Sequence, residues 1–202
     1  MNSSKPRDGW EVLSVTGYLA ALAIVLLLGT VVTRVLLLRR AGTQAMHLGG
    51  LDKTDFLIPP VALFYFYTIF AAAFHWPLVS TRMFFHSNVI AWIGVGLCFI
   101  GLLVLFASLV SFGRSFRVGI DVDQPDKLVT TGIFAVSRNP IYVGFALVLV
   151  GQFLVFPNWV PLVYLASGFL LFHRQVLREE SFMRQHYSEE YADYCRRVRR
   201  YL

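Results

Sequence analysis

The chain has 202 residues, of which 56% are hydrophobic and 15% charged, with a mean hydropathy of +0.61. Soluble domains carry about 25% charged residues, so this composition excludes a disordered chain, a nucleic-acid-binding tail and a typical cytosolic enzyme. Lys and Arg number 18 against 12 Asp and Glu, and their placement fits a membrane topology better than a nucleic-acid surface. The two cysteines, Cys98 and Cys195, suggest neither a disulfide framework nor a zinc site.

Four stretches without a charged residue dominate the sequence: residues 12–33, 56–81, 83–113 and 139–173. The first three each exceed the roughly 20 residues that a helix needs to cross the hydrocarbon core. The fourth contains Pro157 and Pro161, which cannot both lie inside one uninterrupted helix. We therefore expect a helical hairpin, with one helix at about 140–156 and a second from about 161 that continues past Arg174. The sequence thus predicts an all-α integral membrane protein with about five transmembrane helices.

Basic residues set the expected orientation. Segments 39–55 and 112–139 hold three and four Lys or Arg residues, and the tail from Arg174 holds seven. Five crossings place all three segments on one side, which the positive-inside rule makes cytoplasmic. We therefore expect the N-terminus outside and the C-terminus in the cytoplasm.

The tail is expected to form a cytoplasmic amphipathic helix, because six of its residues recur at three- and four-residue steps. These residues are Glu180, Met183, Tyr187, Tyr191, Tyr194 and Val198. Such a helix should lie against the membrane surface or fold back over segment 112–139.

Polar candidates gather in residues 112–142 and in the tail, and polar groups at membrane depth are functional candidates by default. Pro140 suits the first turn of a helix, and Asn139 is a natural N-cap. The free N–H groups there could also bind an anionic or carbonyl group, so capping and binding both remain open. Glu179 and Glu180 are either a solvated pair neutralised by neighbouring arginines (Arg178 and Arg184) or part of a site.

Other familiar chemistry is missing from the sequence. It contains no P-loop, no HExxH motif and no Ser/His/Asp set. The five histidines show no ligand spacing, so we expect no metal site. Gly94 and Gly96 lie in an apolar run with no strand before them, which indicates close helix packing.

Two blocks carry a family resemblance. Residues 128–134 (LVTTGIF) and 137–144 (SRNPIYVG) resemble the stretch LVTxGpYxxxRHPxYxG of the isoprenylcysteine carboxyl methyltransferase and phospholipid methyltransferase family. Residues 179–194 (EESFMRQHYSEEYADY), followed by Val198 and Arg199, resemble that family's tail EExxLxxxFGxxYxxYxxxVxR. We therefore treat the chain as one membrane domain, with a methyltransferase-like core at 89–202 and a variable part at 1–88.

The resemblance implies methyl transfer from S-adenosylmethionine, in a pocket built from the start of the fourth helix and the double-glutamate helix. The implied cofactor contacts are Lys127, Leu128, Val129, Phe134, Arg138, Asn139, Pro140, Tyr142, Glu179 and Glu180. The catalytic candidates are Arg138, Asn139 and Tyr142, and the acceptor-binding candidates are Arg174 and Arg178.

The chain departs from the family pattern at a few positions. Asn139 stands where the family has His, and asparagine cannot carry a proton at neutral pH. Phe134 stands in place of Tyr, and Tyr187 with Ser188 in place of Phe-Gly.

The resemblance leaves the acceptor open among a prenylated-cysteine carboxylate, a phospholipid amine and a small thiol, because all three kinds of acceptor occur among members of the family. Two other functions remain open. One is an NADPH-dependent membrane reductase of the sterol-reductase type, and the other is a non-catalytic membrane protein on the same fold.

Overall fold

The computed structural model describes residues 7–40, 58–74, 76, 83–112 and 128–202, and within them the side chains of 15–37 and from 61 onward. These residues form five α-helices and one short 3-10 helix. They are α1 (Arg7–Arg40), α2 (Ile58–Ala73), α3 (Asn88–Phe112), η3 (Gly132–Ala135), α4 (Pro140–Val155) and α5 (Trp159–Arg197). The expected all-α class is confirmed.

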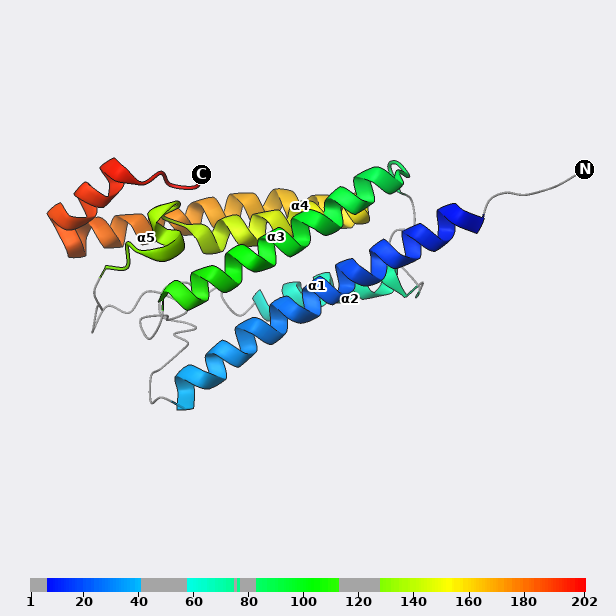
Figure 1. Ribbon diagram of the computed structural model, residues 1–202, viewed down its shortest axis with the longest axis horizontal. Helices are drawn as coiled ribbons and strands as arrows, with labels where there is room; N and C mark the ends of the chain where they lie inside the picture. The colour runs from blue at the N-terminus through cyan, green and yellow to red at the C-terminus, as the bar shows by residue number, and fades with distance from the viewer. Residues whose placement is uncertain (1–6, 41–57, 75, 77–82, 113–127) are drawn as a thin grey trace, which may run out of the picture.

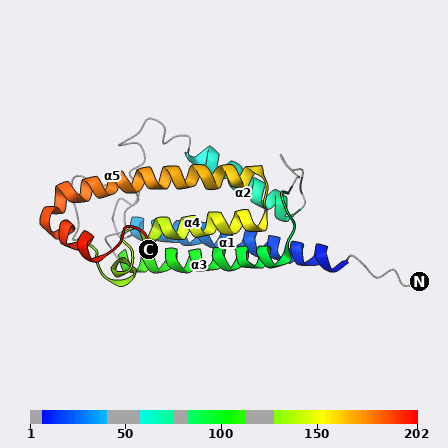
Figure 2. The same cartoon turned by 90° about the horizontal axis from the view of Figure 1, so that it is seen from above.

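Consecutive α-helices run in opposite directions, so the chain alternates direction along the bundle from α1 to α5 (Figures 1 and 2). Within the part of the chain that the structure describes, three helices are long and apolar enough to cross a membrane: Val15–Leu37, Asn88–Phe112 and Trp159–Arg197. The other two, α2 and α4, have 16 residues each, or about 24 Å at 1.5 Å per residue. The start of α4 and the polar C-terminal half of α5 lie at the same end of the bundle, and the site described below is found there.

The predicted hairpin is confirmed, and the second apolar run is shorter as a helix than the sequence indicated. Helix α5 begins at Trp159, where Asn158 caps it by accepting a bond from Val160 N at 3.0 Å. Pro161 therefore falls in the first turn, where its missing N–H costs nothing. Helix α2 ends at Ala73 although the apolar run continues to residue 81, because Pro77 in that run cannot continue a helix.

Helices α3 and α4 are in close contact through glycines. A Cβ atom built on Gly94 would lie 2.7 Å from the carbonyl oxygen of Gly151, and one built on Gly151 would lie 2.5 Å from that of Gly94. The same exchange recurs two turns along, between Gly101 and Gly144. The expectation of close packing is thus confirmed for Gly94 and wrong for Gly96, which has nothing within 4 Å of its Cβ position.

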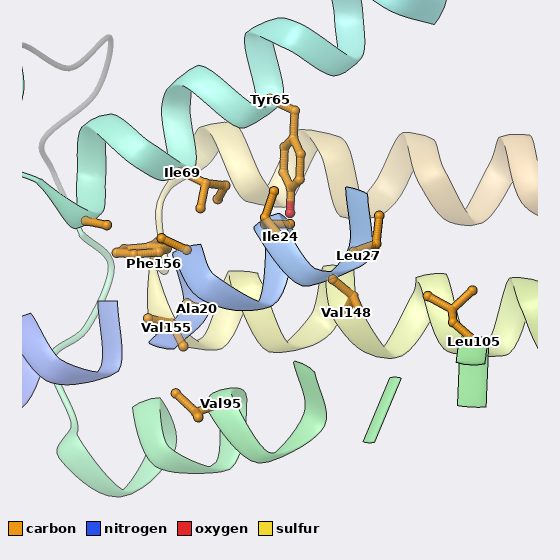
Figure 3. Close-up of a cluster of buried hydrophobic side chains, with 12 residues drawn as sticks. Ala20, Ile24, Leu27, Tyr65, Ile69, Val95, Leu105, Val148, Val155 and Phe156 are labelled. Atoms are coloured by element: carbon orange, nitrogen blue, oxygen red, sulfur yellow. The ribbon is translucent and has the colours of Figure 1, made fainter. Parts of the chain in front are cut away.

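A hydrophobic cluster joins α1, α2, α3 and α4 (Figure 3). Ile24 of α1 and Ile69 of α2 are almost completely buried in it. Within the cluster region Gln152 is also fully buried, and its Nε2 donates to Ala20 O at 2.8 Å. This bond ties α4 to α1, so the two N-terminal helices are held against the α3–α4 pair.

The polar half of α5 does not run straight to its end. Ser188 interrupts the helix with φ 40° and ψ −109°, and the chain then turns back toward the start of α4 (Figure 1). Ser137 and Arg199 form a parallel β-bridge there. Of the two expected placements of the tail, the structure shows the one in which it folds back, here over residues 134–139.

The expected apolar face of the tail is confirmed. Glu180, Tyr191 and Tyr194 are buried, and the other three members of the set are half-buried.

Candidate functional site

The connection before α4 is anchored on two sides. Gly132 has φ 65°, and a Cβ there would clash with Ser111 Oγ, so glycine is required by conformation and by space. Ile133 N donates to the same Ser111 oxygen at 3.4 Å. Phe134 lies edge-on to Phe112 at 4.6 Å between ring centroids, and its carbonyl accepts a bond from Tyr194 OH at 2.6 Å. Segment 132–135 is therefore fixed between α3 and the returning tail.

Arg138 joins this connection to α5 and to the chain end. Its Nε and Nη2 donate to Glu180 Oε1 at 3.2 and 2.9 Å. Its Nη1 donates to the carbonyls of Cys195 at 3.2 Å and Val198 at 2.8 Å. Four of the five guanidinium hydrogens are thus used inside the protein, in bonds that cross 42 to 60 positions of sequence.

Glu180 lies at the centre of this network and is only 3% exposed. Its Oε1 accepts from Arg138 and from Asn139 Nδ2, the latter at 3.3 Å. Its Oε2 accepts from Arg200 Nε and Nη2 at 3.1 and 2.9 Å. The alternative of a solvated glutamate neutralised by its helical neighbours is therefore wrong for Glu180, because the kink at Ser188 brings Arg200 over it.

Asn139 occupies the N-cap position of α4, but its side chain makes no capping bond. Its Nδ2 donates to Glu180 Oε1 and, at 3.1 Å, to the Arg200 carbonyl. Simple side-chain capping is thus wrong for this residue, whose amide instead joins two long-range partners. Pro140 is at the first helical position, as predicted, and is almost fully buried.

Glu179 forms a second, separate group with α4. Tyr142 OH donates to Glu179 Oε1 at 2.6 Å, and Gln175 Nε2 donates to the same oxygen at 3.0 Å. The Tyr142 ring also packs against the Phe172 ring, with 5.8 Å between the ring centroids. Glu179 is half-buried, and both of these bonds from described residues reach Oε1.

The charges of the two groups balance. Arg138 and Arg200 carry two positive charges against the two carboxylates of Glu179 and Glu180. Burial alone would lower the pKa of Arg138, but its bonds to Glu180 outweigh that effect and raise it. The bonds to Glu180 likewise raise the pKa of Arg200. Both guanidinium groups therefore stay charged at any physiological pH.

The structure brings together most of the predicted residues, and some lie apart. Leu128 and Val129 are half-buried in the segment before η3. Lys127 lies outside the described residues. Arg174 and Arg178 lie exposed on α5, five residues and one residue before Glu179. In the described part of the chain no group of three or more His, Cys, Asp or Glu side chains is placed to hold a metal ion.

Two residues of the network were missed by sequence reasoning. Gln175 carries no signal beyond lying one helical turn before Glu179. Arg200 does carry a sequence signal. The family tail ends in VxR, with the arginine two positions after the valine. When the valine is Val198, that arginine is Arg200 and not Arg199.

Comparisons with known proteins agree with this picture. Residues 89–190, just over half of the chain, match the phospholipid methyltransferase family. The probable protein-S-isoprenylcysteine O-methyltransferase of Oryza sativa subsp. indica is 31% identical over 114 residues, covering 54% of this chain and 59% of that protein. The protein-S-isoprenylcysteine O-methyltransferase of Tribolium castaneum is 30% identical over 141 residues, covering 65% of this chain and 50% of that protein. Protein-S-isoprenylcysteine O-methyltransferase B of Arabidopsis thaliana is 27% identical over 108 residues, covering 52% and 55%.

The chain spans between half and three fifths of the length of these relatives. The matched family region contains Arg138, Tyr142 and both glutamates, the residues that the structure brings to one end of the bundle. The chain therefore belongs to the phospholipid methyltransferase family.

Proposed function

We propose that this chain transfers a methyl group from S-adenosylmethionine to the carboxylate of a prenylated cysteine or a similar lipid-like acceptor, at the cytoplasmic face of a membrane. The observation that carries the proposal is the contact between the two polar segments. Tyr142 and Glu179, 37 positions apart in the sequence, meet at 2.6 Å, and Arg138 and Glu180 meet beside them.

The available hydrogen-bonding atoms suit this donor. Glu179 Oε2 can accept from the ribose hydroxyls or from the ammonium group of the donor, which makes Glu179 the better candidate of the two glutamates because both oxygens of Glu180 are occupied. The remaining N–H of Arg138 and the first free amides of α4 can hold the donor's carboxylate. Asn139 would assist by fixing the helix start. Leu128, Val129 and Phe134 supply the apolar surface that an adenine ring needs.

When bound, the donor supplies a methyl group already activated by the sulfonium charge, so the protein chiefly aligns the reactants. Tyr142 is held by Glu179 and contacts Phe172, and it would line the path between donor and acceptor. A carboxylate acceptor needs no base, whereas an amine or thiol must first lose a proton. Asn139 offers no such base, and this favours the carboxylate.

The acceptor would approach from the lipid. Arg174 and Arg178, exposed on the same helix as the glutamates, are the candidates to pair with its carboxylate. The positive-inside rule, applied to the basic segments described above, supports a cytoplasmic position for this end of the bundle and an outside position for the N-terminus. A polar donor from the cytoplasm and an apolar acceptor from the membrane can then reach one site.

The test is donor binding by the detergent-purified full chain, measured by calorimetry with S-adenosylmethionine. Glu179→Gln and Tyr142→Phe should weaken binding at least tenfold, whereas Glu190→Gln, a change of the same kind at an exposed position of the same helix, should leave it unchanged. Equal binding by Glu179→Gln and the unsubstituted protein would exclude this placement of the donor.

Product analysis identifies the acceptor. The purified protein is incubated with labelled donor and, separately, with N-acetyl-S-farnesylcysteine, phosphatidylethanolamine or a small thiol, and methylated products are measured by mass spectrometry. We expect product from the farnesylcysteine alone. Binding of NADPH without binding of S-adenosylmethionine would instead indicate a reductase, and donor binding without any product would indicate a non-catalytic relative.

A further inference from the structure

Residues 198–201, which follow α5, form a short segment that we call the C-terminal strap. It lies beyond the family match, which ends at residue 190, yet Val198, Arg199 and Arg200 are each bonded to residues of the site. The Val198 carbonyl accepts from Arg138 Nη1 at 2.8 Å, the Arg199 carbonyl from Arg138 N at 3.0 Å and the Arg200 carbonyl from Asn139 Nδ2 at 3.1 Å. Tyr201 OH bonds to His173 Nδ1 of α5 at 2.8 Å.

Arg200 is the member of the strap whose side chain enters the network. Its guanidinium holds Glu180 Oε2 through two bonds, while Arg138 and Asn139 both bond to Oε1. The Arg200 side chain is 34% exposed and that of Arg138 is 9% exposed, so Arg200 covers the solvent side of the carboxylate. Without Arg200, these two bonds to Glu180 Oε2 would be lost, and the direction of the bonds that Oε1 accepts from Arg138 and Asn139 would be less tightly fixed.

We propose that Arg200 is a positioning residue of the methyl-donor site. By holding one oxygen of Glu180, it directs the other toward Arg138 and Asn139 and so fixes the start of α4, where the donor's carboxylate would bind. The backbone carbonyl of Arg200 also accepts a bond from Asn139 Nδ2. The side chain and the backbone of Arg200 therefore both act on the start of α4. This inference rests on the proposed function, since its main test measures the affinity of the protein for the methyl donor.

Arg199 provides a matched control. It is the adjacent residue, carries the same charge and is exposed, and its contributions to the network are the backbone bridge to Ser137 and the bond from Arg138 N. Arg199→Ala therefore removes a strap cation while leaving the network intact. Arg200→Lys keeps the charge but loses the planar fork that makes two parallel bonds.

The experiment measures S-adenosylmethionine affinity by calorimetry on the full chain in detergent, together with kcat and with KM for N-acetyl-S-farnesylcysteine. We expect Arg200→Ala to raise the donor Kd at least tenfold with the acceptor KM changed less than twofold. Arg200→Lys should lie between, and Arg199→Ala should match the unsubstituted protein. A donor Kd unchanged in Arg200→Ala would overturn the inference, as would equal losses in Arg199→Ala.

A second readout does not depend on the donor. The carbonyl of Cys195 accepts a bond from Arg138, and Cys195, a half-buried free cysteine, lies three residues before the strap in the sequence. Release of the strap in Arg200→Ala should speed maleimide modification of Cys195 severalfold, with no change in Arg199→Ala, while the buried Cys98 stays protected in the folded protein. An unchanged Cys195 rate refutes the positioning role. Failure of the unsubstituted protein to bind S-adenosylmethionine refutes the proposed function instead.

Discussion

The contact between α3 and α4 can be tested with two glycines that lie two residues apart on the same helix. Gly94 faces α4, where an added Cβ would lie 2.7 Å from the Gly151 carbonyl oxygen, 2.9 Å from Leu154 Cβ and 3.0 Å from Val155 Cγ2. Gly96 is exposed and has nothing within 4 Å of its Cβ position. Gly94→Ala and Gly96→Ala therefore add the same methyl group in opposite environments.

The two substitutions should change the free energy of unfolding in opposite directions. Alanine is favoured over glycine inside a helix by up to about 1 kcal/mol, and both variants gain this term. In Gly94→Ala the Val155 methyl can rotate away, but the Gly151 carbonyl is backbone and cannot move without shifting α4. Overpacking of this kind costs about 1–3 kcal/mol. We therefore expect Gly94→Ala to lose about 1–2 kcal/mol and Gly96→Ala to gain up to about 1 kcal/mol.

The assay is thermal unfolding in detergent. Unfolding is monitored by the chemical labelling of the buried Cys98 thiol in a Cys195→Ser background. Cys98 suits this purpose because it is 0% exposed and its Sγ donates to the Val148 carbonyl at 3.7 Å across the same interface. The unfolding midpoint should fall in Gly94→Ala and stay level or rise in Gly96→Ala. Equal midpoints for the two variants would refute the close approach of the helices.

Three further changes test other parts of the fold by unfolding measurements. Ser188→Gly should stabilise the protein by about 1 kcal/mol because a residue with a Cβ atom is strained at φ 40°, and no gain would argue against the kink. Tyr65→Phe should stabilise by about 1–3 kcal/mol because the buried hydroxyl has no hydrogen-bond partner among the described residues. The control Tyr164→Phe should destabilise by about 0.6 kcal/mol, since that hydroxyl donates to Val61 O at 2.9 Å; the reverse order would contradict both. Glu180→Gln should cost about 3–5 kcal/mol because it leaves the buried Arg138 without its counter-charge, and a loss below 1 kcal/mol would show that the pair is dispensable.

The helices were predictable because their signal is local. An apolar run of more than 20 residues is stable in lipid only as a helix, and Pro157 and Pro161 mark the hairpin whatever the rest of the chain does. The early end of α2 at Ala73 shows the limit of this signal. Hydropathy gives the extent of the membrane-embedded chain, but Pro77 within the run decides where the helix can continue.

The sequence indicated which residues would lie together, but not how they would pair. The spacing of two motifs identified Arg138, Tyr142 and the two glutamates, and the structure brings them together. The different partners of Glu179 and Glu180 could not be predicted, because adjacent helical residues point about 100° apart and their partners come from different elements. Glu179 faces Tyr142 of α4, and Glu180 faces Arg138 and the chain end.

The pairing of Glu180 with Arg200 depends on a conformation that the residue type at position 188 disfavours. Twenty residues of straight helix would carry Arg200 about 30 Å away from Glu180, whereas the two side chains meet at 2.9 Å. The chain closes this gap by reversing at Ser188, the position where the family pattern has glycine. A non-glycine residue there costs about 1–3 kcal/mol, and the bonds from Arg138, Asn139 and Arg200 must offset it. The strap is therefore held in place by the site it covers, and loss of the Arg200 side chain should release both together.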